Sequence, residues 1–409
     1  MASFPDGALA IAEGRVAACG DYADVRRGYP DAPVRDLRGG YLLPGFVDTH
    51  LHFPQVRVLG GLGYSLLEWL DALTLPEEAR LADAAYACTI AKEFVRNLAA
   101  HGTTTSLVFG SHFPNAMAAL FHAAESAGLR VISGLVLADR NLRPELHQTP
   151  GAAYEESQEL IRRFHGRGRL GYAVTPRFAL STTEPMLEAC QTLLQQQPGL
   201  HLTTHINENV REVEEVARLF PWAGDYLSVY ERFELAGRRS VFAHNVQSTN
   251  SELQRLAGHG SSVAHCPCSN AALGSGIFPL RRHLEARVRF ALGTDVGGGT
   301  GFGMMKEALQ AYLMQRVAHD PVTLNPAQML YLATRAGAEA LALDSETGDF
   351  GAGKSADYVY LQPPSGSALE GVLKNVEDPE RVLAAIITLA GAESIREVRV
   401  EGDLVYEAS

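Results

Sequence analysis

The sequence has little cysteine, no run of basic residues and no long apolar stretch, and each shortage excludes a class of protein. Five scattered cysteines in 409 residues cannot build a disulfide framework. Acidic residues outnumber basic ones, 47 against 35, and the net charge of −12 would repel a nucleic-acid backbone. No apolar run approaches the roughly 20 residues that span a bilayer, and Met1–Gly20 lacks the pattern of a secretory signal. We therefore expect a cytoplasmic protein with no nucleic-acid partner and no membrane contact.

The composition that remains is that of a globular protein, 46% hydrophobic and 20% charged. Short β-rich runs alternate with stretches of helical periodicity through the middle of the chain. The predicted strands are Gly45–Thr49, Thr104–Phe109, Arg130–Leu137, Gly171–Thr175, Leu202–Thr204, Ser240–Ala243, Ser262–His265 and Arg289–Gly293. Helices are predicted over Glu77–Ala100, Asn115–Ala127, Tyr154–Phe164, Glu184–Gln196 and Glu208–Phe220. Eight such strands predict an α/β protein with a (β/α)8 TIM barrel, although a doubly wound open sheet gives the same alternation.

The two ends of the chain have a different pattern, of short alternating runs split by glycine-containing turns. Ala8–Gly20 and Glu397–Tyr406 each predict a hairpin, and Tyr358–Gln362 a further strand. Neither end holds enough strands for a stable sheet of its own. We therefore expect residues 1–42 and 345–409 to combine into one small composite β domain, packed on a barrel of residues 43–344.

Side chains with metal-binding or acid–base chemistry stand where the predicted strands end. His50 and His52 alternate on the end of the first strand, so both imidazoles can point the same way. Later strand ends carry Arg177 and Phe178, His205 followed by Glu208, His244, and Asp295. The carboxyl ends of barrel strands form one face, so we expect these groups to converge there.

Three or four histidines and one carboxylate converging from different strands are typical of a mononuclear divalent-metal site, with Zn²⁺ or Fe²⁺ as the suitable ion. Such an ion lowers the pKa of a bound water and generates hydroxide at neutral pH. Asp295 is placed to take the proton of that water, and Glu208 to protonate a substrate nitrogen. A lone histidine is usually structural, but five such groups at the ends of four strands are hard to produce by chance.

Other groups with similar chemistry are interpreted as structural. His265 ends the seventh strand and is assigned a structural or supporting role outside the ligand set. The same structural interpretation covers His101, His112, His122, His147, His165, His201, His259, His283 and His319. Residues 348–355 match a phosphate-binding loop, but a helical run precedes them and a strand follows, which reverses the required order. Cys266-Pro-Cys268 lacks the spacing of a cytidine-deaminase zinc site.

These strand-end residues and their neighbouring segments resemble the amidohydrolase superfamily, and within it the guanine deaminases. The superfamily resemblance rests on Pro44–His52 (PGFVDTHLH), on the histidines of strands five and six and on Gly293-Thr-Asp295. The closer resemblance rests on 52–55 (HFPQ), 66–70 (LLEWL), 101–105 (HGTTT), 175–178 (TPRF), 204–209 (THINEN), 264–270 (AHCPCSN) and 293–297 (GTDVG). It covers residues 14–406. Members of the family usually have another β segment before the run at Gly7–Ile11, where this sequence has only Met1–Asp6, so we expect a reduced small β domain.

The resemblance implies a homodimer with one zinc ion per subunit, iron being the other candidate, and hydrolysis of guanine to xanthine and ammonia by attack of a metal-bound hydroxide on C2. Each role is carried over by position. His50, His52, His205 and Asp295 would hold the metal, and His244 would hydrogen-bond the bound water and the tetrahedral intermediate. Gln55 and Arg177 would read the polar edge of the purine and Phe178 would lie against its ring. Glu208 would protonate N3, and it and His205 would both contact the substrate.

Two alternatives stay open at this point. A deaminase of a related aminoheterocycle, such as 8-oxoguanine, or a chloro-heterocycle hydrolase would share the metal site and differ in the loops. A scaffold protein on an inactive amidohydrolase fold is the alternative from outside the enzymes. Both carboxylates, Glu208 and Asp295, are intact, and that favours the enzyme.

Overall fold

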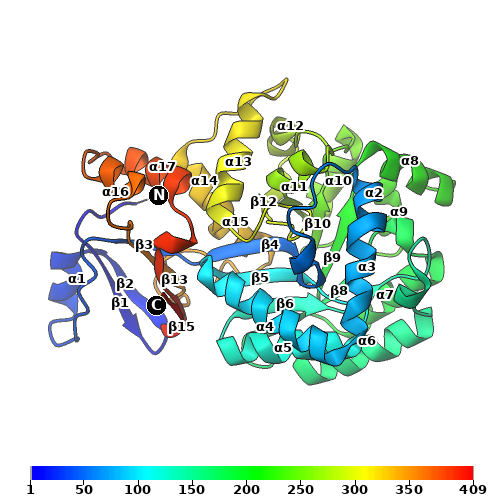
Figure 1. Cartoon of the computed structure of the whole chain (residues 1–409), viewed down its shortest axis with the longest axis horizontal. Coiled ribbons are helices and arrows are strands. Elements are labelled where there is room, and N and C mark those ends of the chain that lie inside the picture. The colour runs from blue at the N-terminus through cyan, green and yellow to red at the C-terminus, as the bar shows by residue number, and fades with distance from the viewer. Residues whose placement is uncertain (1, 409) are drawn as a thin grey trace.

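Eight parallel strands form one continuous sheet that wraps into a barrel in the computed structural model, which describes residues 2–408 (Figure 1). The strands follow the order of the chain around the barrel, with the short β7 (Val136–Leu137) paired to β8 at one side. They are β4 (Phe46–His52), β5 (Thr103–Phe109), β6 (Arg130–Gly134), β8 (Leu170–Pro176), β9 (His201–Ile206), β10 (Ser240–His244), β11 (Ser262–His265) and β12 (Arg289–Leu292). The predicted (β/α)8 barrel is confirmed.

The barrel closes where β4 meets β12 and the residues that follow it. Thr49 Oγ1 donates to the carbonyl of Leu292 at 2.9 Å, and the backbone N–H of Asp295 donates to the carbonyl of His50 at 2.8 Å. Gly293 allows this close approach, because an added Cβ there would lie 2.9 Å from the Cβ of His50. The seam therefore sets the first and last strand ends, with their histidines and aspartate, against each other.

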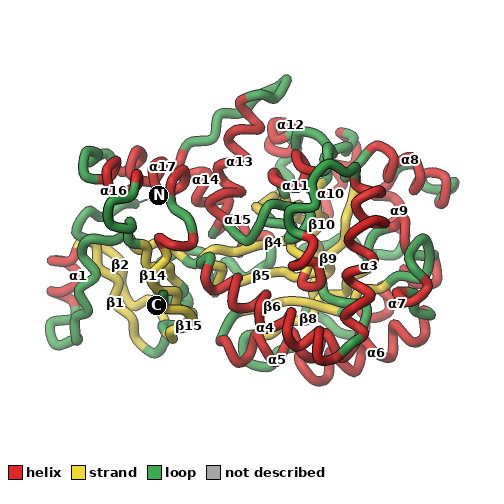
Figure 2. The backbone as a smooth tube through the Cα atoms, in the orientation of Figure 1, coloured by secondary structure: helices red, strands yellow, loops and turns green. Residues whose placement is uncertain are grey.

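Helices cover the outside of the barrel, as Figure 2 shows in red around the yellow strands. They are α2 (Leu66–Trp69), α3 (Leu75–Ala79), α4 (Ala84–Ala100), α5 (Pro114–Ala127), α6 (Pro150–Phe164), α7 (Glu184–Gln196), α8 (Val210–Leu219), α9 (Tyr226–Arg232), α10 (Asn250–His259), α11 (Pro267–Ala272), α12 (Leu280–Glu285), α13 (Met304–Arg316), α14 (Pro326–Ala333) and α15 (Arg335–Ala340). Their apolar faces and the outward face of the strands build the main hydrophobic core. Among the described residues, no helix combines the length and apolar character needed to cross a membrane.

Three elements differ from the sequence-based predictions. The single helix expected over Glu77–Ala100 is two helices, because Asp83 takes an extended ψ of 116° and caps α4 by accepting from the N–H of Tyr86. The strand expected over Arg130–Leu137 is interrupted at Leu135, whose N–H turns to the hydroxyl of Tyr172. The helix expected from Glu208 begins two residues later, leaving Glu208 in the preceding loop.

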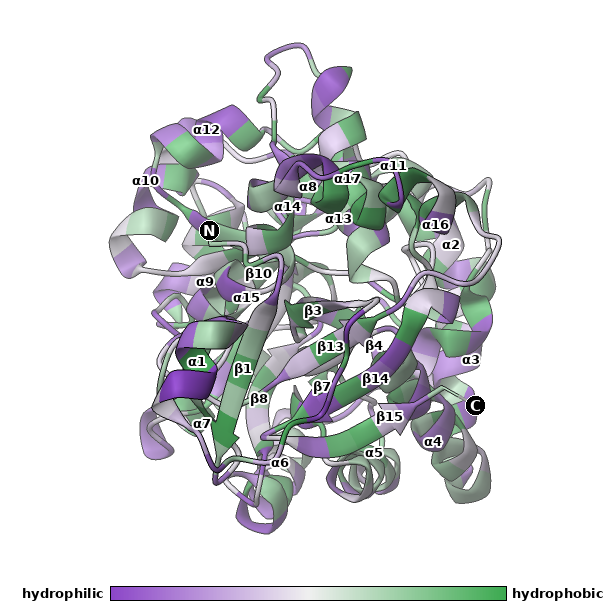
Figure 3. Ribbon diagram, turned by 90° about the vertical axis from the view of Figure 1, so that its left-hand side faces the viewer, coloured by the Kyte–Doolittle hydropathy of each residue, from purple (hydrophilic) through white to green (hydrophobic). Residues whose placement is uncertain are grey.

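The two ends of the chain combine into a second, antiparallel sheet. Strand β3 (Tyr41–Pro44) pairs with β13 (Tyr358–Leu361), followed by β14 (Ile395–Val400) and β15 (Asp403–Glu407). The hairpin of β1 (Gly7–Ala12) and β2 (Arg15–Asp21) is a separate two-stranded sheet, with the polar α1 (Tyr22–Gly28) beside it (Figure 3). The C-terminal segment also contains α16 (Ala368–Leu373) and α17 (Pro379–Leu389), which the β-only expectation omitted. The composite sheet is confirmed, but its N-terminal strand is β3, and the expectation that the Ala8–Gly20 hairpin joins it was wrong. The domain boundaries at residues 42/43 and 344/345 stay a prediction.

A buried ion pair fastens the composite sheet to the barrel. Arg130 on β6 donates through Nη1 to Oδ2 of Asp357 at 2.7 Å, and both side chains are buried. Residues 348–355, which resemble a phosphate loop, lie after α15 and before β13, in the order that does not form a phosphate site.

Candidate active site

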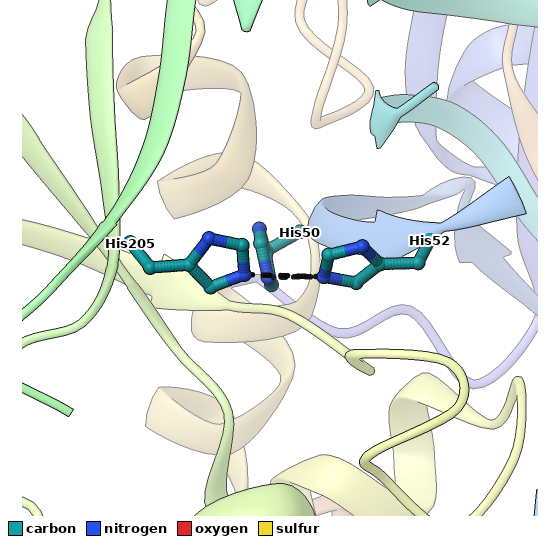
Figure 4. Close-up of side chains that lie close together, drawn as sticks. All are labelled: His50, His52 and His205. Carbon is teal, nitrogen blue, oxygen red and sulfur yellow. Dashed lines mark hydrogen bonds between the residues drawn. The ribbon is translucent and has the colours of Figure 1, made fainter. Parts of the chain in front are cut away.

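The carboxyl end of β4 directs His50 and His52 to one point. Their Nε2 atoms lie 3.2 Å apart, and His52 Nε2 lies 3.2 Å from Nε2 of His205 on β9 (Figure 4). A hydrogen bond to the backbone orients the side chain of His205: its Nδ1 lies 2.7 Å from the carbonyl oxygen of Arg177 and must donate to it. This bond fixes the tautomer that leaves the Nε2 lone pair facing the other two rings.

Asp295 completes the cluster from the loop after β12. Its Oδ1 lies 3.3 Å from Nε2 of His50 and 3.2 Å from Nε2 of His52. Burial alone would raise the pKa of Asp295, but the hydrogen bonds that His50 and His52 make to it hold it well below the usual range. Asp295 also takes a positive φ of 47°, a conformation that a non-glycine residue adopts at a cost and that is concentrated at functional sites.

Four donor atoms that converge from β4, β9 and the loop after β12 fit a metal ion. Burial lowers the pKa of His50, of His52 to about 4 and of His205, so the three imidazoles are neutral at pH 7. Ligand atoms about 2.0–2.1 Å from a tetrahedral zinc ion are about 3.3–3.4 Å apart, close to the 3.2–3.3 Å separations here. Neutral imidazoles plus one carboxylate suit Zn²⁺ or Fe²⁺.

His244 and Glu208 lie together beside the cluster. Nε2 of His244 lies 3.5 Å from Oε2 of Glu208 and 4.0 Å from Oδ2 of Asp295. The other ring nitrogen of His244, Nδ1, lies 3.0 Å from Oδ1 of Asn270. Ser275 Oγ donates to Oε1 of Glu208 at 3.2 Å. Burial, together with the nearby charges of Glu212 and Asp295, raises the pKa of Glu208 well above its ordinary value. A carboxyl group in this state can carry a proton at neutral pH.

A pocket opens over the cluster, and His52, His205 and Asp295 are part of its lining. Arg177, Phe178 and Gln55 all line it, as the sequence predicts. Leu66, Trp69 and Leu70 form an apolar wall on α2 and just beyond it. This short helix is fixed by a capping box between Ser65 and Glu68, with Ser65 Oγ donating to Glu68 at 2.6 Å. Polar groups and an apolar wall on one pocket suit a flat, polar-edged ring.

Sequence reasoning missed Glu78, a buried carboxylate on α3 that pairs with Arg177 and accepts from Gln55. It also missed Asp48, buried on β4, which accepts from the N–H and hydroxyl of Thr294 at 3.1 and 2.5 Å and from the N–H of His50 at 3.2 Å. A buried arginine at a strand end was the available signal, because such a charge requires a carboxylate partner.

His265 lies away from the convergence point. Its ring stacks on Phe278 with centroids 4.2 Å apart, in agreement with the structural interpretation. His112, also interpreted as structural, lies closer to the pocket than that interpretation implies: its Nε2 is 3.5 Å from Oε2 of Glu78.

Comparisons with known proteins extend over almost the whole chain. The amidohydrolase family matches residues 41–405, and an imidazolonepropionase-like composite domain of bacteria matches residues 7–32. A probable guanine deaminase of Deinococcus radiodurans is 58% identical, over 99% of this chain and 94% of its own length. Guanine deaminase of Escherichia coli is 40% identical, over 98% of this chain and 91% of its own. The solved structure of the Escherichia coli enzyme superposes with a TM-score of 0.95 at 39% identity, over 98% of this chain and 93% of that one.

Proposed function

Since the chain belongs to the amidohydrolase family, and within it to the guanine deaminases, we propose that its pocket hydrolyses guanine to xanthine and ammonia with the residues assigned below. The reaction makes the protein a hydrolase of a C–N bond. The observation that carries the proposal is that one pocket is lined both by His52, His205 and Asp295 of the cluster and by the polar side chains of Gln55 and Arg177.

We assign one divalent cation per subunit to His50, His52, His205 and Asp295, with zinc first and iron second. The convergence of three neutral imidazoles and one ionised carboxylate supports this assignment. When bound, the cation supplies Lewis acidity that lowers the pKa of a water molecule.

Three side chains move or hold protons in the proposed reaction. Asp295 accepts a proton from the attacking water as the new bond to C2 of guanine forms. Glu208 gives its proton to ring N3, so that C2 becomes electrophilic and the ring accepts the electron pair. His244, fixed by Asn270, hydrogen-bonds the oxygen that attacks. Asp295 then delivers the proton it took from water to the exocyclic amine, and the C2–N bond breaks to release ammonia. The hydroxyl proton at C2 returns to Glu208 as the C2 carbonyl of xanthine forms.

Recognition of the purine falls to Gln55, Arg177 and Phe178. The planar guanidinium of Arg177 suits a carbonyl oxygen better than an ammonium would. Phe178 is buried beside His205, with ring centroids 6.0 Å apart, and can lie against the purine face. Adenine lacks the carbonyl oxygen and would leave the Arg177 donor unpaired, so the site should reject it strongly.

We propose further that the enzyme is a cytoplasmic homodimer. All five cysteines are free in the structure, which suits a reducing compartment. The dimer follows from the resemblance to the guanine deaminases, and sedimentation of the purified protein tests it: a single species of one subunit mass would exclude a stable dimer.

The experiment that tests the function is ammonia release from zinc-loaded enzyme with guanine, 8-oxoguanine, adenine, cytosine and a triazine. Fast turnover of guanine with little turnover of adenine is expected. Turnover of another ring without guanine would keep the metal mechanism and place the error in Gln55 and Arg177. With metal bound and no turnover of any of the five, the proposed function would be wrong.

A further inference from the structure

Glu78 is a buried carboxylate that none of the proposed chemical steps uses, although it contacts both polar residues that face the substrate. Its side chain is 2% exposed. Oε1 accepts from Nε2 of Gln55 at 2.8 Å, and Oε2 accepts from Nη1 of Arg177 at 2.5 Å. Gln55 lies just beyond β4 and Arg177 just beyond β8, so one carboxylate on α3 joins residues from separate strand ends.

We propose that Glu78 is a positioning residue that sets the specificity of the pocket, by holding Gln55 and Arg177 in the orientation that recognises the 6-oxo, N1–H edge of guanine. The inference rests on the proposed function and deepens it. Glu78 itself does not line the pocket and does not touch the reacting atoms.

The amide of Gln55 is fixed at both ends. Its Nε2 donates to Glu78, while its Oε1 accepts from the backbone N–H of Gly297 at 3.2 Å. These two bonds settle which end is oxygen and which is nitrogen, because the reverse orientation would set donor against donor and acceptor against acceptor. One N–H and one oxygen lone pair remain for a ligand, which presents a donor and an acceptor side by side.

Arg177 is held by the same carboxylate through only one of its five N–H groups. Its charge is thereby balanced without blocking the rest of the guanidinium, which lines the pocket. Burial would raise the pKa of Glu78, but Arg177 and His112 hold it well below the ordinary value, so the carboxylate stays ionised over the working pH range. A free guanidinium in this position would be unpaired and could rotate.

A specificity role differs from a merely structural one in what it does to different ligands. If Glu78 only held α3 against the barrel, its loss would weaken the binding of every ligand and lower the stability of the fold as well. If it orients Gln55 and Arg177, its loss should weaken guanine far more than 2-aminopurine, the same ring without the 6-oxygen, because only guanine uses the Arg177 donor.

The test compares Glu78→Gln with the control Glu77→Gln, measuring kcat and KM for guanine and the competitive inhibition constant of 2-aminopurine. Glu77 is the adjacent residue of α3, is also largely buried and pairs with Arg80 and Tyr86, away from the pocket. For Glu78→Gln we expect KM for guanine to rise about tenfold or more, with the inhibition constant of 2-aminopurine within about twofold of wild type. Glu77→Gln should change neither constant.

Two further variants keep the test decisive if Glu78→Gln does not fold. Glu78→Asp retains the charge but shortens the side chain. It should raise KM for guanine by a smaller factor than Glu78→Gln does, and leave the inhibition constant of 2-aminopurine unchanged. The double variant Glu78→Gln/Arg177→Ala leaves no buried charge unpaired, and its KM should exceed that of Arg177→Ala by less than the single change does in wild type.

An equal rise in both constants, or no rise in either, would overturn the proposed role of Glu78. Wild-type enzyme that turns over guanine while Glu78→Gln behaves in this way would refute only this inference. Wild-type enzyme with metal bound and no turnover of guanine would instead refute the proposed function.

Discussion

Replacing Glu208 with glutamine should abolish proton transfer while leaving the metal site in place. Glutamine keeps the volume of the side chain and an oxygen that can accept from Ser275, 3.2 Å away, so the pocket should keep its shape. The change removes a carboxyl group beside the cluster whose pKa is raised by burial and by the neighbouring Glu212 and Asp295. A positioned general acid contributes about 10²- to 10⁴-fold, so kcat should fall by that factor, equivalent to about 3–5 kcal/mol of barrier.

The assay is xanthine formation at saturating guanine, with the metal content of each preparation measured in parallel. Glu214→Gln is the matched control, because Glu214 is an exposed glutamate on α8 and should not affect kcat. Glu208→Gln with full metal content and an unchanged kcat would refute the acid–base assignment. A loss of metal with the loss of activity would show that Glu208 holds the cluster together, and would equally contradict the reasoning.

Four other results are expected. Asp295→Ala should remove activity and weaken metal affinity as well, measured by metal titration, because the cluster loses its only anionic ligand; unchanged affinity would contradict the ligand assignment. Chelation of the metal should abolish turnover and lower the midpoint of thermal unfolding, and added zinc should restore both, since an ion bound only by the folded state stabilises that state. Phe178→Ala should raise KM for guanine without changing metal content; an unchanged KM would show that the ring does not contact the purine. Arg130→Ala should lower the free energy of unfolding in urea by about 3–5 kcal/mol and move acid unfolding to higher pH. Burial alone would raise the pKa of Asp357, but Arg130 holds it below the ordinary value. Ionised Asp357 therefore stabilises the wild-type fold above about pH 4, and that contribution disappears as pH falls through its folded pKa. An unchanged midpoint of acid unfolding in this variant would show that the Arg130–Asp357 pair does not stabilise the fold against acid.

The barrel and the convergence of the strand-end residues could be predicted from sequence because both depend on local periodicity and one topological rule. Each strand is a short β-rich run, and the carboxyl ends of parallel strands meet on one face. That rule predicted His50 beside His205, 155 residues later in the chain, and the structure brings their rings to 4.8 Å between centroids. Assigning roles to these residues required the chemistry of the donor set and the resemblance as well.

Glu78 could not be predicted in the same way, because its environment depends on contacts that are not local. Two glutamates after Pro76 have the appearance of an ordinary acidic first helical turn, where exposed carboxylates are common. The partner that explains its burial, Arg177, lies 99 residues away. The break between α3 and α4 at Asp83 was missed for a related reason: apolar spacing continues across it, and only the capping hydrogen bond shows the interruption.

The most direct test of the account is the relation between bound metal and xanthine formation in purified enzyme. Metal-free protein, titrated with zinc, should gain activity toward guanine in proportion to bound zinc and reach its maximum at one ion per subunit. His50→Ala should bind zinc weakly and remain inactive over the same range. Full guanine turnover by metal-free protein, or a saturated site with no xanthine formed, would contradict the assignment of His50, His52, His205 and Asp295 as the centre of this reaction.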